Sequence, residues 1–344
     1  MRLRVIAVLS GATLAFGSLS LAGEATQAAT TALSAAQHQR LNESCEGCHD
    51  DVAREWRQSN HRNAYTDPTF QRALSLEPLP FCRGCHAPAA PSQRAAEGWA
   101  ADTGVTCVAC HVRDGKVLGT REVKGAPHAM AVDADFGTNA CASCHEFKFP
   151  RSPERMQKTM TEHRASPSAD RACSSCHMPV GAAGAPAAGR RGRSHEFAFG
   201  TRPEDLRGAL KVTARRVAGD VVELTLKASG VGHSFPTGDL FRRIEVVALA
   251  QGAPAESAAR ASVGRRFALD RIPEVELEDT RIPAGGERVV RLTVPRATGR
   301  EIGYRVLYQR VELPEGHGAG SRQEAPRRAP PKIAFELVLH EGTL

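Results

Sequence analysis

The ten cysteines of this 344-residue chain all belong to five Cys-x-x-Cys pairs, and a histidine follows each pair directly. Two thiols at this spacing and an adjacent imidazole are the attachment signature of c-type haem, in which the thiols bond to the porphyrin and the histidine binds the iron. The cysteine pairs are Cys45 and Cys48, Cys82 and Cys85, Cys107 and Cys110, Cys141 and Cys144, and Cys173 and Cys176. The histidines that follow them are His49, His86, His111, His145 and His177. The sequence therefore predicts five covalently bound haem c groups.

Three other chemistries use paired cysteines, and each accounts for less of the pattern. A zinc site built from Cys-x-x-Cys pairs does not require a histidine after every pair. A disulfide framework suits an exported protein but leaves the histidines unexplained. Redox-active dithiols of the thioredoxin kind normally occur singly on a βαβ unit. Haem attachment is the interpretation that uses all the cysteines together with the histidines beside them.

The motifs lie too close together in the sequence for an ordinary hydrophobic core. Residues 45–177 provide about 27 residues per motif, and segments of that size cannot bury a sufficient core unaided. We therefore expect the porphyrins to supply buried apolar surface and to lie near one another, close enough to exchange electrons. The chain without haem is predicted not to fold.

Residues 1–22 are predicted to be a secretory signal peptide. Arg2 and Arg4 form a basic start, an apolar stretch follows over residues 5–21, and small residues lead to Ala22. A transmembrane anchor is the alternative, but the apolar stretch is short and weak beside the roughly 20 residues that a spanning helix needs. The sequence thus predicts an exported chain, periplasmic or extracellular at the cell surface, with no membrane span after the signal is removed.

Each haem iron has a second axial position, and its occupant decides between electron transfer and catalysis. Histidines outside the motifs are more plentiful candidates for this position than the few methionines. His61 follows a predicted helix that leaves the first motif. It lies 12 residues beyond His49, a little over three helical turns, so we expect it to serve a neighbouring haem.

Two further candidates lie in loops beyond the third and fifth motifs. His128 lies in the sequence KGAPHAM, where proline can fix a turn. His195 lies in RSHEFAFG, where Phe197 and Phe199 are placed to pack on a porphyrin edge. Both histidines are predicted to be distal ligands.

Together with His233, considered below, these candidates leave one of the five positions unsettled. Either His38 or His163 occupies it, or it has no protein ligand. His317, in a glycine-rich loop, is a weaker candidate. His340 alternates with apolar residues on a terminal strand and is expected to be exposed.

The second part of the chain changes from helix and loop to alternating strands. Val222, Leu224 and Leu226, for example, alternate with polar residues. The predicted strands are 210–217, 221–228, 243–250, 263–269, 275–281, 288–294, 302–311 and 333–340. Their spacing predicts an immunoglobulin-like antiparallel β-sandwich. The expected fold class is α + β in two domains, a pentahaem cytochrome c domain over residues 38–200 and the sandwich over residues 209–344.

The segment 230–239, GVGHSFPTGD, differs from an ordinary connection between strands. It holds three glycines, a proline and a histidine, so its backbone can closely approach another part of the molecule. We expect this loop to insert His233 into the haem domain as a distal ligand, with Phe235 against the porphyrin. The alternative is a bulged hairpin with a solvated histidine.

These motifs resemble multihaem c-type cytochromes related to the tetrahaem cytochrome of ammonia-oxidising bacteria and to the octahaem hydroxylamine oxidoreductases. The resemblance rests on CEGCHDDVAREWRQSNHRNAY, GVTCVACH, CASCHEF, and MQKTMTE ahead of CSSCHMP, and the HSFPTGD loop resembles a β-domain attached to many members. It implies an exported electron carrier with mostly bis-histidine haems and His61, His195 and His233 as distal ligands. The fifth motif departs from the tetrahaem pattern, and the octahaem enzymes' full motif set is missing.

The predicted function is to relay electrons between respiratory redox partners, such as a quinol-oxidising system, other cytochromes or a terminal reductase. An electron carrier is favoured over an enzyme. One alternative is a reductase or oxidoreductase of a small nitrogen compound, acting at one haem with an open distal side. Another is a polymerising extracellular cytochrome in which one chain lends a histidine, such as His38, to its neighbour. The net charge of +7 is spread along the chain and does not favour a nucleic-acid partner.

Overall fold

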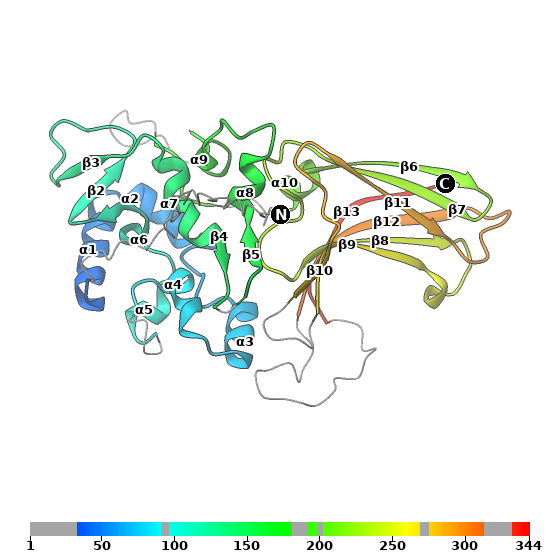
Figure 1. The fold of residues 1–344 in the computed structure, drawn as a ribbon, viewed down its shortest axis with the longest axis horizontal. Coiled ribbons are helices and arrows are strands. Elements are labelled where there is room, and N and C mark those ends of the chain that lie inside the picture. Colours follow the sequence, from blue (N-terminus) through cyan, green and yellow to red (C-terminus); the bar gives the residue numbers. More distant parts are fainter. Residues whose placement is uncertain are drawn as a thin grey trace, which may run out of the picture. The chain divides into compact units, whose positions relative to one another are not determined.

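The computed structural model describes residues 33–90, 96–150, 152–180, 192–197, 202–268, 275–312 and 332–344, and the side chain of residue 268 is not described. The predicted signal peptide lies outside these residues. Contacts join Leu33–Leu344 into one compact unit, with helices and short strands in its first part and long strands in its second (Figure 1). Within the described ranges, no helix combines the length and the apolar character that crossing a membrane requires.

Every Cys-x-x-Cys-His motif lies on a short helical segment or at the end of a helix. The helices that carry the motifs are α1 (Ala35–Cys48), α4 (Arg83–His86), α6 (Cys107–His111), α7 (Phe136–His145) and α9 (Cys173–His177). Cysteines three residues apart on a helix point to the same side, so both thiols of a pair can reach one porphyrin. The motif histidine ends its helix or, in the first motif, follows it directly.

The connections between these helices are short helices and small sheets. The other helices of this part are α2 (Asp50–Arg57), α3 (Pro68–Leu76), η1 (Pro80–Cys82), α5 (Trp99–Asp102) and α8 (Thr159–Arg164). The strands are β1 (Val112–Arg113), β2 (Lys116–Gly119), β3 (Met130–Val132), β4 (Glu146–Lys148) and β5 (Arg155–Lys158). The helix predicted after the first motif is present as α2. The Glu146 carboxylate accepts hydrogen bonds from Met160 N at 3.0 Å and Thr161 N at 3.1 Å, which fixes the start of α8 on β4.

This first part buries few large apolar side chains of its own. Its fully buried hydrophobic residues among those described are Ala53, Trp56, Ala87, Ala89, Ala100, Val108, Met156 and Met160. The main hydrophobic cluster contains only residues from Leu206 onward. The proposal that porphyrins complete the interior of the first part remains a prediction.

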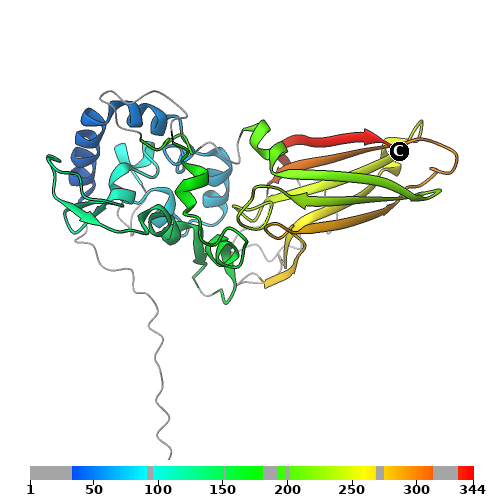
Figure 2. The ribbon, with the colours of Figure 1, turned by 90° about the horizontal axis from the view of Figure 1, so that it is seen from above.

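All eight strands predicted for the second part are present, and α10 (Pro203–Gly208) and η2 (Ala255–Ser257) accompany them. The strands are β6 (Leu210–Ala218), β7 (Val221–Ala228), β8 (Arg242–Ala250), β9 (Ala259–Ala268), β10 (Val275–Asp279), β11 (Glu287–Thr293), β12 (Ile302–Val311) and β13 (Ile333–Thr343). They form sheets in the orders β10-β9-β8-β12-β13 and β11-β7-β6, with antiparallel pairing throughout (Figure 2). Helices with antiparallel sheets confirm the α + β class. The immunoglobulin-like, two-domain arrangement stays a prediction.

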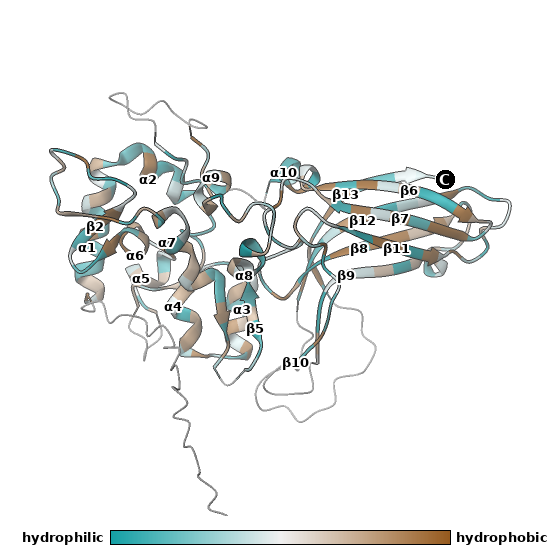
Figure 3. Cartoon of the chain, turned by 45° about the horizontal axis from the view of Figure 1, so that its top comes forward, coloured by the Kyte–Doolittle hydropathy of each residue, from teal (hydrophilic) through white to brown (hydrophobic). Residues whose placement is uncertain are grey.

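The alternation along β7 holds in the structure. Val222, Leu224 and Leu226 are fully buried in the cluster shared by both sheets, and strands of mixed hydropathy are visible in Figure 3. Glu223, which the pattern places on the polar face, is also buried, because Arg215 and Arg291 on the flanking strands cover its carboxylate.

The expectation that His340 is exposed was also wrong. The residue is half-buried on β13, and its ring stacks on Tyr304 with ring centres 5.8 Å apart and planes at 7°. The adjacent strand β12 supplies this aromatic partner, which a pattern read along a single strand does not reveal.

Replacing Leu224 by alanine tests the core of the two sheets. Leu224→Ala removes a fully buried side chain and is expected to lower the free energy of unfolding by about 2–5 kcal/mol. Val289→Ala, on the neighbouring strand but 47% exposed, should cost less than about 1 kcal/mol. Far-UV circular dichroism of the haem-loaded chain during chemical unfolding measures both. Equal losses would contradict this assignment of the core.

Candidate functional site

Three of the motif histidines face a histidine from outside the motifs. The ring centres of His61 and His145 are 6.3 Å apart, those of His111 and His195 are 6.3 Å apart, and those of His177 and His233 are 6.1 Å apart. In each pair, the partner is a residue that the sequence nominated as a distal ligand. The pairs involve the third, fourth and fifth motifs.

The spacing of these pairs fits one metal ion held between two imidazoles. A metal-bound imidazole nitrogen lies about 2 Å from the ion, and its ring centre lies about 1 Å further out. Two rings on opposite sides of one ion therefore have centres about 6 Å apart. The three pairs differ in interplanar angle, at 78°, 30° and 17°, which is compatible because each ring can turn about the line through its nitrogen and the ion. The histidines present therefore fit haem irons with two imidazole ligands.

Backbone carbonyl groups fix the orientation of several of these imidazoles. In each case Nδ1 donates a hydrogen bond to a carbonyl oxygen, which leaves Nε2 free for a metal. The contacts are His86 to Ala64 at 2.7 Å, His111 to Leu118 at 3.2 Å, His195 to Arg193 at 2.9 Å and His233 to Ser234 at 3.1 Å. The tautomer that these bonds select is the one that Nε2 ligation requires.

Burial keeps the facing histidines neutral. Burial, together with the neighbouring histidines, lowers the pKa of His61 to about 4. His177 keeps part of its surface accessible, yet partial burial lowers its pKa to about 4 as well. Burial also lowers the pKa of His145 and His233. A neutral imidazole is the form that binds a metal, so these side chains are ready to act as ligands near pH 7.

A close backbone contact holds the loop that carries His61. Val105 N donates to the carbonyl oxygen of His61 at 2.7 Å, and Gly104 N donates to that of Arg62 at 2.8 Å. A side chain at Gly104 would collide with the carbonyl oxygen of His61 and lie 2.8 Å from Ala64 N. Sequence reasoning missed this glycine, although its position just before the third motif, in GVTCVACH, was visible.

The loop at His195 brings a phenylalanine against the pair formed by His61. Phe197 lies with its ring centre 4.3 Å from that of His61 and 5.8 Å from that of His195, edge to face in both cases. The His195 backbone N–H donates to Glu55 Oε2 at 2.6 Å, which ties this loop to α2. Phe199 lies outside the described residues.

Phe235 is placed differently from the expectation. We expected its ring against the porphyrin served by His233. Instead it is 5% exposed in the core of the two sheets and stacks on Tyr308 with ring centres 6.1 Å apart. Its backbone pairs with that of Ile282. Phe235 therefore anchors the loop in the second part of the chain, while His233 beside it faces the fifth motif.

The structure does not bring His128, His49 or His86 into such a pair. His128 is exposed on the loop between β2 and β3, and within the described part of the chain it makes no hydrogen bond or ring contact. His49 is exposed between α1 and α2, near His111 and His195. His128 stays a predicted ligand.

His86 has an aromatic neighbour of another kind. Its ring stacks on that of Phe70, with centres 3.6 Å apart and planes at 5°. Charged groups from separate segments also lie near it: Asp67, Asp239 and Arg310 all influence its pKa, which burial lowers. Arg310 lies 3.3 Å from Asp67 and 3.1 Å from Asp239.

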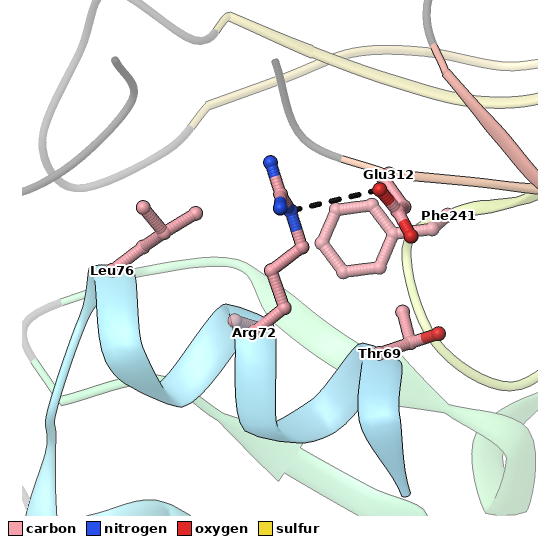
Figure 4. A pocket seen from close by; sticks show the side chains of 6 residues that line it. Thr69, Arg72, Leu76, Phe241 and Glu312 are labelled. Atoms are coloured by element: carbon pink, nitrogen blue, oxygen red, sulfur yellow. Dashed lines mark ion pairs between the residues drawn. The ribbon is translucent and has the colours of Figure 1, made fainter. Parts of the chain in front are cut away.

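A second ion pair joins the same two parts of the chain. Arg72 on α3 lies 3.6 Å from Glu312, just beyond β12, and both line a small pocket together with Phe241 (Figure 4). No motif in the sequence marks these charged residues, because they come together only through the fold.

The two alternatives for the remaining ligand, His38 and His163, have other partners. His38 is buried on α1, and its Nε2 lies 2.6 Å from Thr106 Oγ1. Both ring nitrogens of His163 lie near carbonyl oxygens, Nδ1 at 2.9 Å from Gly232 and Nε2 at 2.8 Å from Arg171. Neither residue keeps an Nε2 free. His317 lies outside the described residues.

The motif helices contact one another in a branched order. Helix α1 contacts α6, α6 contacts α7, and α7 also contacts α4 and α9. Thiols of different motifs meet at α7. A hydrogen bond from Cys85 lowers the pKa of Cys144, and one from Cys141 lowers the pKa of Cys173. The fourth motif therefore lies beside the second, third and fifth.

No cysteine is paired with another in a disulfide bond. Across the described ranges, no group of three or more His, Cys, Asp or Glu side chains is placed to hold a metal ion. Six of the described histidines instead lie in the three pairs given above.

Residues 44–112 match the sequence model of the family described as cytochrome c554 and c-prime. The fold is similar to a crystal structure of a penta-heme cytochrome c552 from Thermochromatium tepidum, with a TM-score of 0.62 and 19% sequence identity over 91% of this chain and 99% of that one. These findings support a multihaem c-type cytochrome. No curated protein gives a significant match.

Substituting the glycine behind His61 tests how that ligand is held. Gly104→Ala forces the His61 loop away from its place and should lower the free energy of unfolding by about 1–3 kcal/mol. It should also increase the high-spin haem signal in the electron paramagnetic resonance spectrum. Gly208→Ala is the control, because a Cβ there meets nothing within 4 Å. Unchanged spectra and stability in Gly104→Ala would contradict the contact.

Proposed function

We propose that the chain is an exported pentahaem c-type cytochrome that relays electrons between respiratory redox partners through closely packed, mostly bis-histidine haems. The observation that carries the proposal is the set of three facing histidine pairs, each with a spacing of 6.1–6.3 Å. Two protein ligands fill both axial positions of an iron, which suits electron transfer rather than substrate binding. Five haems follow from the five motifs.

In each proposed site, some residues would attach the porphyrin and others would bind the iron. The two cysteines of a motif would hold the porphyrin covalently, and the motif histidine would bind one side of the iron. His61, His195 and His233 would bind the opposite side for the fourth, third and fifth motifs. Bound haem iron supplies a one-electron couple whose potential depends on axial ligands and burial.

The branched order of the motif helices supports a route for electrons. Helix α7 contacts three other motif helices, so the fourth motif would connect the second, third and fifth haems. The first motif would join through the third, because α1 contacts α6. Gly137 on α7 leaves no room for a Cβ beside Ser174 on α9, which draws these two helices together. Such proximity is what electron exchange between haems needs.

The partners and location of the protein belong to this proposal. A quinol-oxidising system, another cytochrome or a terminal reductase would exchange electrons with it through a small, electrostatically guided contact. Export through the predicted signal peptide would place it in the periplasm or at the cell surface. We also retain His128 as the proposed distal ligand of a haem that the three facing pairs do not account for.

Counting haems and electrons tests the proposed function. The haem-loaded chain should carry five haems and take up five electrons per molecule in a redox titration. A Cys173→Ser, Cys176→Ser double variant should carry four haems and take up four electrons, because the fifth motif has lost both attachment points. Mass spectrometry and absorption spectra measure the haem count.

Ser175→Ala is the matched control for this variant. It changes the fifth motif between its two cysteines, where the Ser175 hydroxyl lies 3.8 Å from Cys176 Sγ, and should keep all five haems. A chain with fewer than five haems before any substitution, or a double variant that keeps five, would contradict the proposal.

The surroundings of His86 in the second motif favour one further candidate function. His86 stacks on Phe70 and faces no second histidine among the described residues, so one haem with an open distal side would suit a reductase of a small nitrogen compound. An open iron binds carbon monoxide when reduced, whereas an iron with two histidines resists it. Carbon monoxide binding by about one haem in five would favour this reductase. If no haem binds carbon monoxide and the spectra are purely low-spin, the reductase is excluded and the electron carrier remains.

A further inference from the structure

Two adjacent residues of α8 contact the backbone on either side of His233. Glu162 Oε2 accepts a hydrogen bond from Ser234 N at 3.2 Å. His163 Nδ1 lies 2.9 Å from the carbonyl oxygen of Gly232, the residue before the histidine. The peptide groups that flank His233 are therefore both held by one short helix.

The carboxylate of Glu162 is itself fixed by a buried arginine. Arg281 donates to Glu162 Oε1, and only 6% of the Arg281 side chain and 10% of the Glu162 side chain are exposed. Arg281 precedes Ile282, which exchanges backbone hydrogen bonds of 2.8 and 2.9 Å with Phe235. Glu162 thus holds the loop directly at Ser234 and, through Arg281, at the segment that pairs with Phe235.

The ring of His163 forms the other half of the contact. Its Nε2 lies 2.8 Å from the carbonyl oxygen of Arg171, so contacts at both ring nitrogens fix the position of the ring. A glycine in the loop leaves room for this close approach. A Cβ on Gly232 would lie 3.2 Å from His163 Nδ1 and 3.2 Å from the Cβ of Ser168.

We propose that Glu162 and His163 are positioning residues that hold His233 opposite His177. The inference rests on the proposed function, in which His233 binds the distal side of the haem of the fifth motif. Both residues contact the loop at its backbone, His163 at Gly232 and Glu162 at Ser234. Their effect passes through the backbone at Gly232 and Ser234, which sets where the imidazole of His233 can reach.

Spin-state measurements on the full haem-loaded chain test this role. Glu162→Ala and His163→Ala release the loop, so each should convert up to one haem in five from low spin to high spin in the electron paramagnetic resonance spectrum. Added free imidazole should restore the low-spin signal, because it replaces a ligand that is displaced rather than a haem that is lost. Glu162→Gln keeps an acceptor oxygen for Ser234 N and should show a smaller change than Glu162→Ala.

Glu276→Ala is the matched control. Glu276 also joins the first part of the chain to the strands, with Lys158 at 3.3 Å and Arg265 at 2.8 Å, and its side chain is 14% exposed. It does not contact the loop around His233. A merely structural role for Glu162 would make the two alanine variants alike, whereas positioning predicts a spin change only in Glu162→Ala.

His233→Ala separates failure of this inference from failure of the proposed function. If His233→Ala yields one high-spin haem while Glu162→Ala and His163→Ala match the unsubstituted chain, positioning by α8 is refuted and the ligand role stands. An equal spin change in Glu276→Ala also refutes positioning. Unchanged spectra in His233→Ala would refute the ligand role, and the inference with it.

Discussion

Opposed imidazole rings impose the strictest spacing in this fold. A metal ion between two rings fixes their centres about 6 Å apart, and three pairs of histidines meet that spacing. One member of each pair ends a helix that carries a cysteine motif. The other comes from a segment outside the motifs, so the fold must bring separate segments together at this spacing.

Local patterns in the sequence predicted the parts that depend on neighbouring residues. The cysteine motifs, the helix after the first motif and all eight long strands follow from spacing and alternation, which act over a few residues. The pairing of the histidines could not be predicted, because it depends on residues far apart in the sequence. No local sequence pattern indicates that His61 faces His145 or that Gly104 supports the loop of His61. Those contacts arise only when separate segments fold together. Phe235 and His340 were misplaced because their partners lie on neighbouring strands.

The second part of the chain has a structural role in the candidate site. Its two sheets bury a conventional core, and one loop from them carries His233. Charged groups from both parts meet around this loop and around His86, where Arg310 lies between Asp67 and Asp239. A β structure with a core of its own thus carries one of the candidate ligands, His233, for a region that has few large buried side chains.

The carbonyl groups that receive the Nδ1 hydrogen bonds have a further consequence. Every amino acid brings the same backbone oxygen, so the side chains at Ala64, Leu118, Arg193 and Ser234 are not what selects the imidazole tautomer. Substituting these side chains would therefore leave the acceptor oxygen in place. In the proposed haem sites, the electronic character of each histidine would depend on the peptide group located there and not on the side chain that it carries.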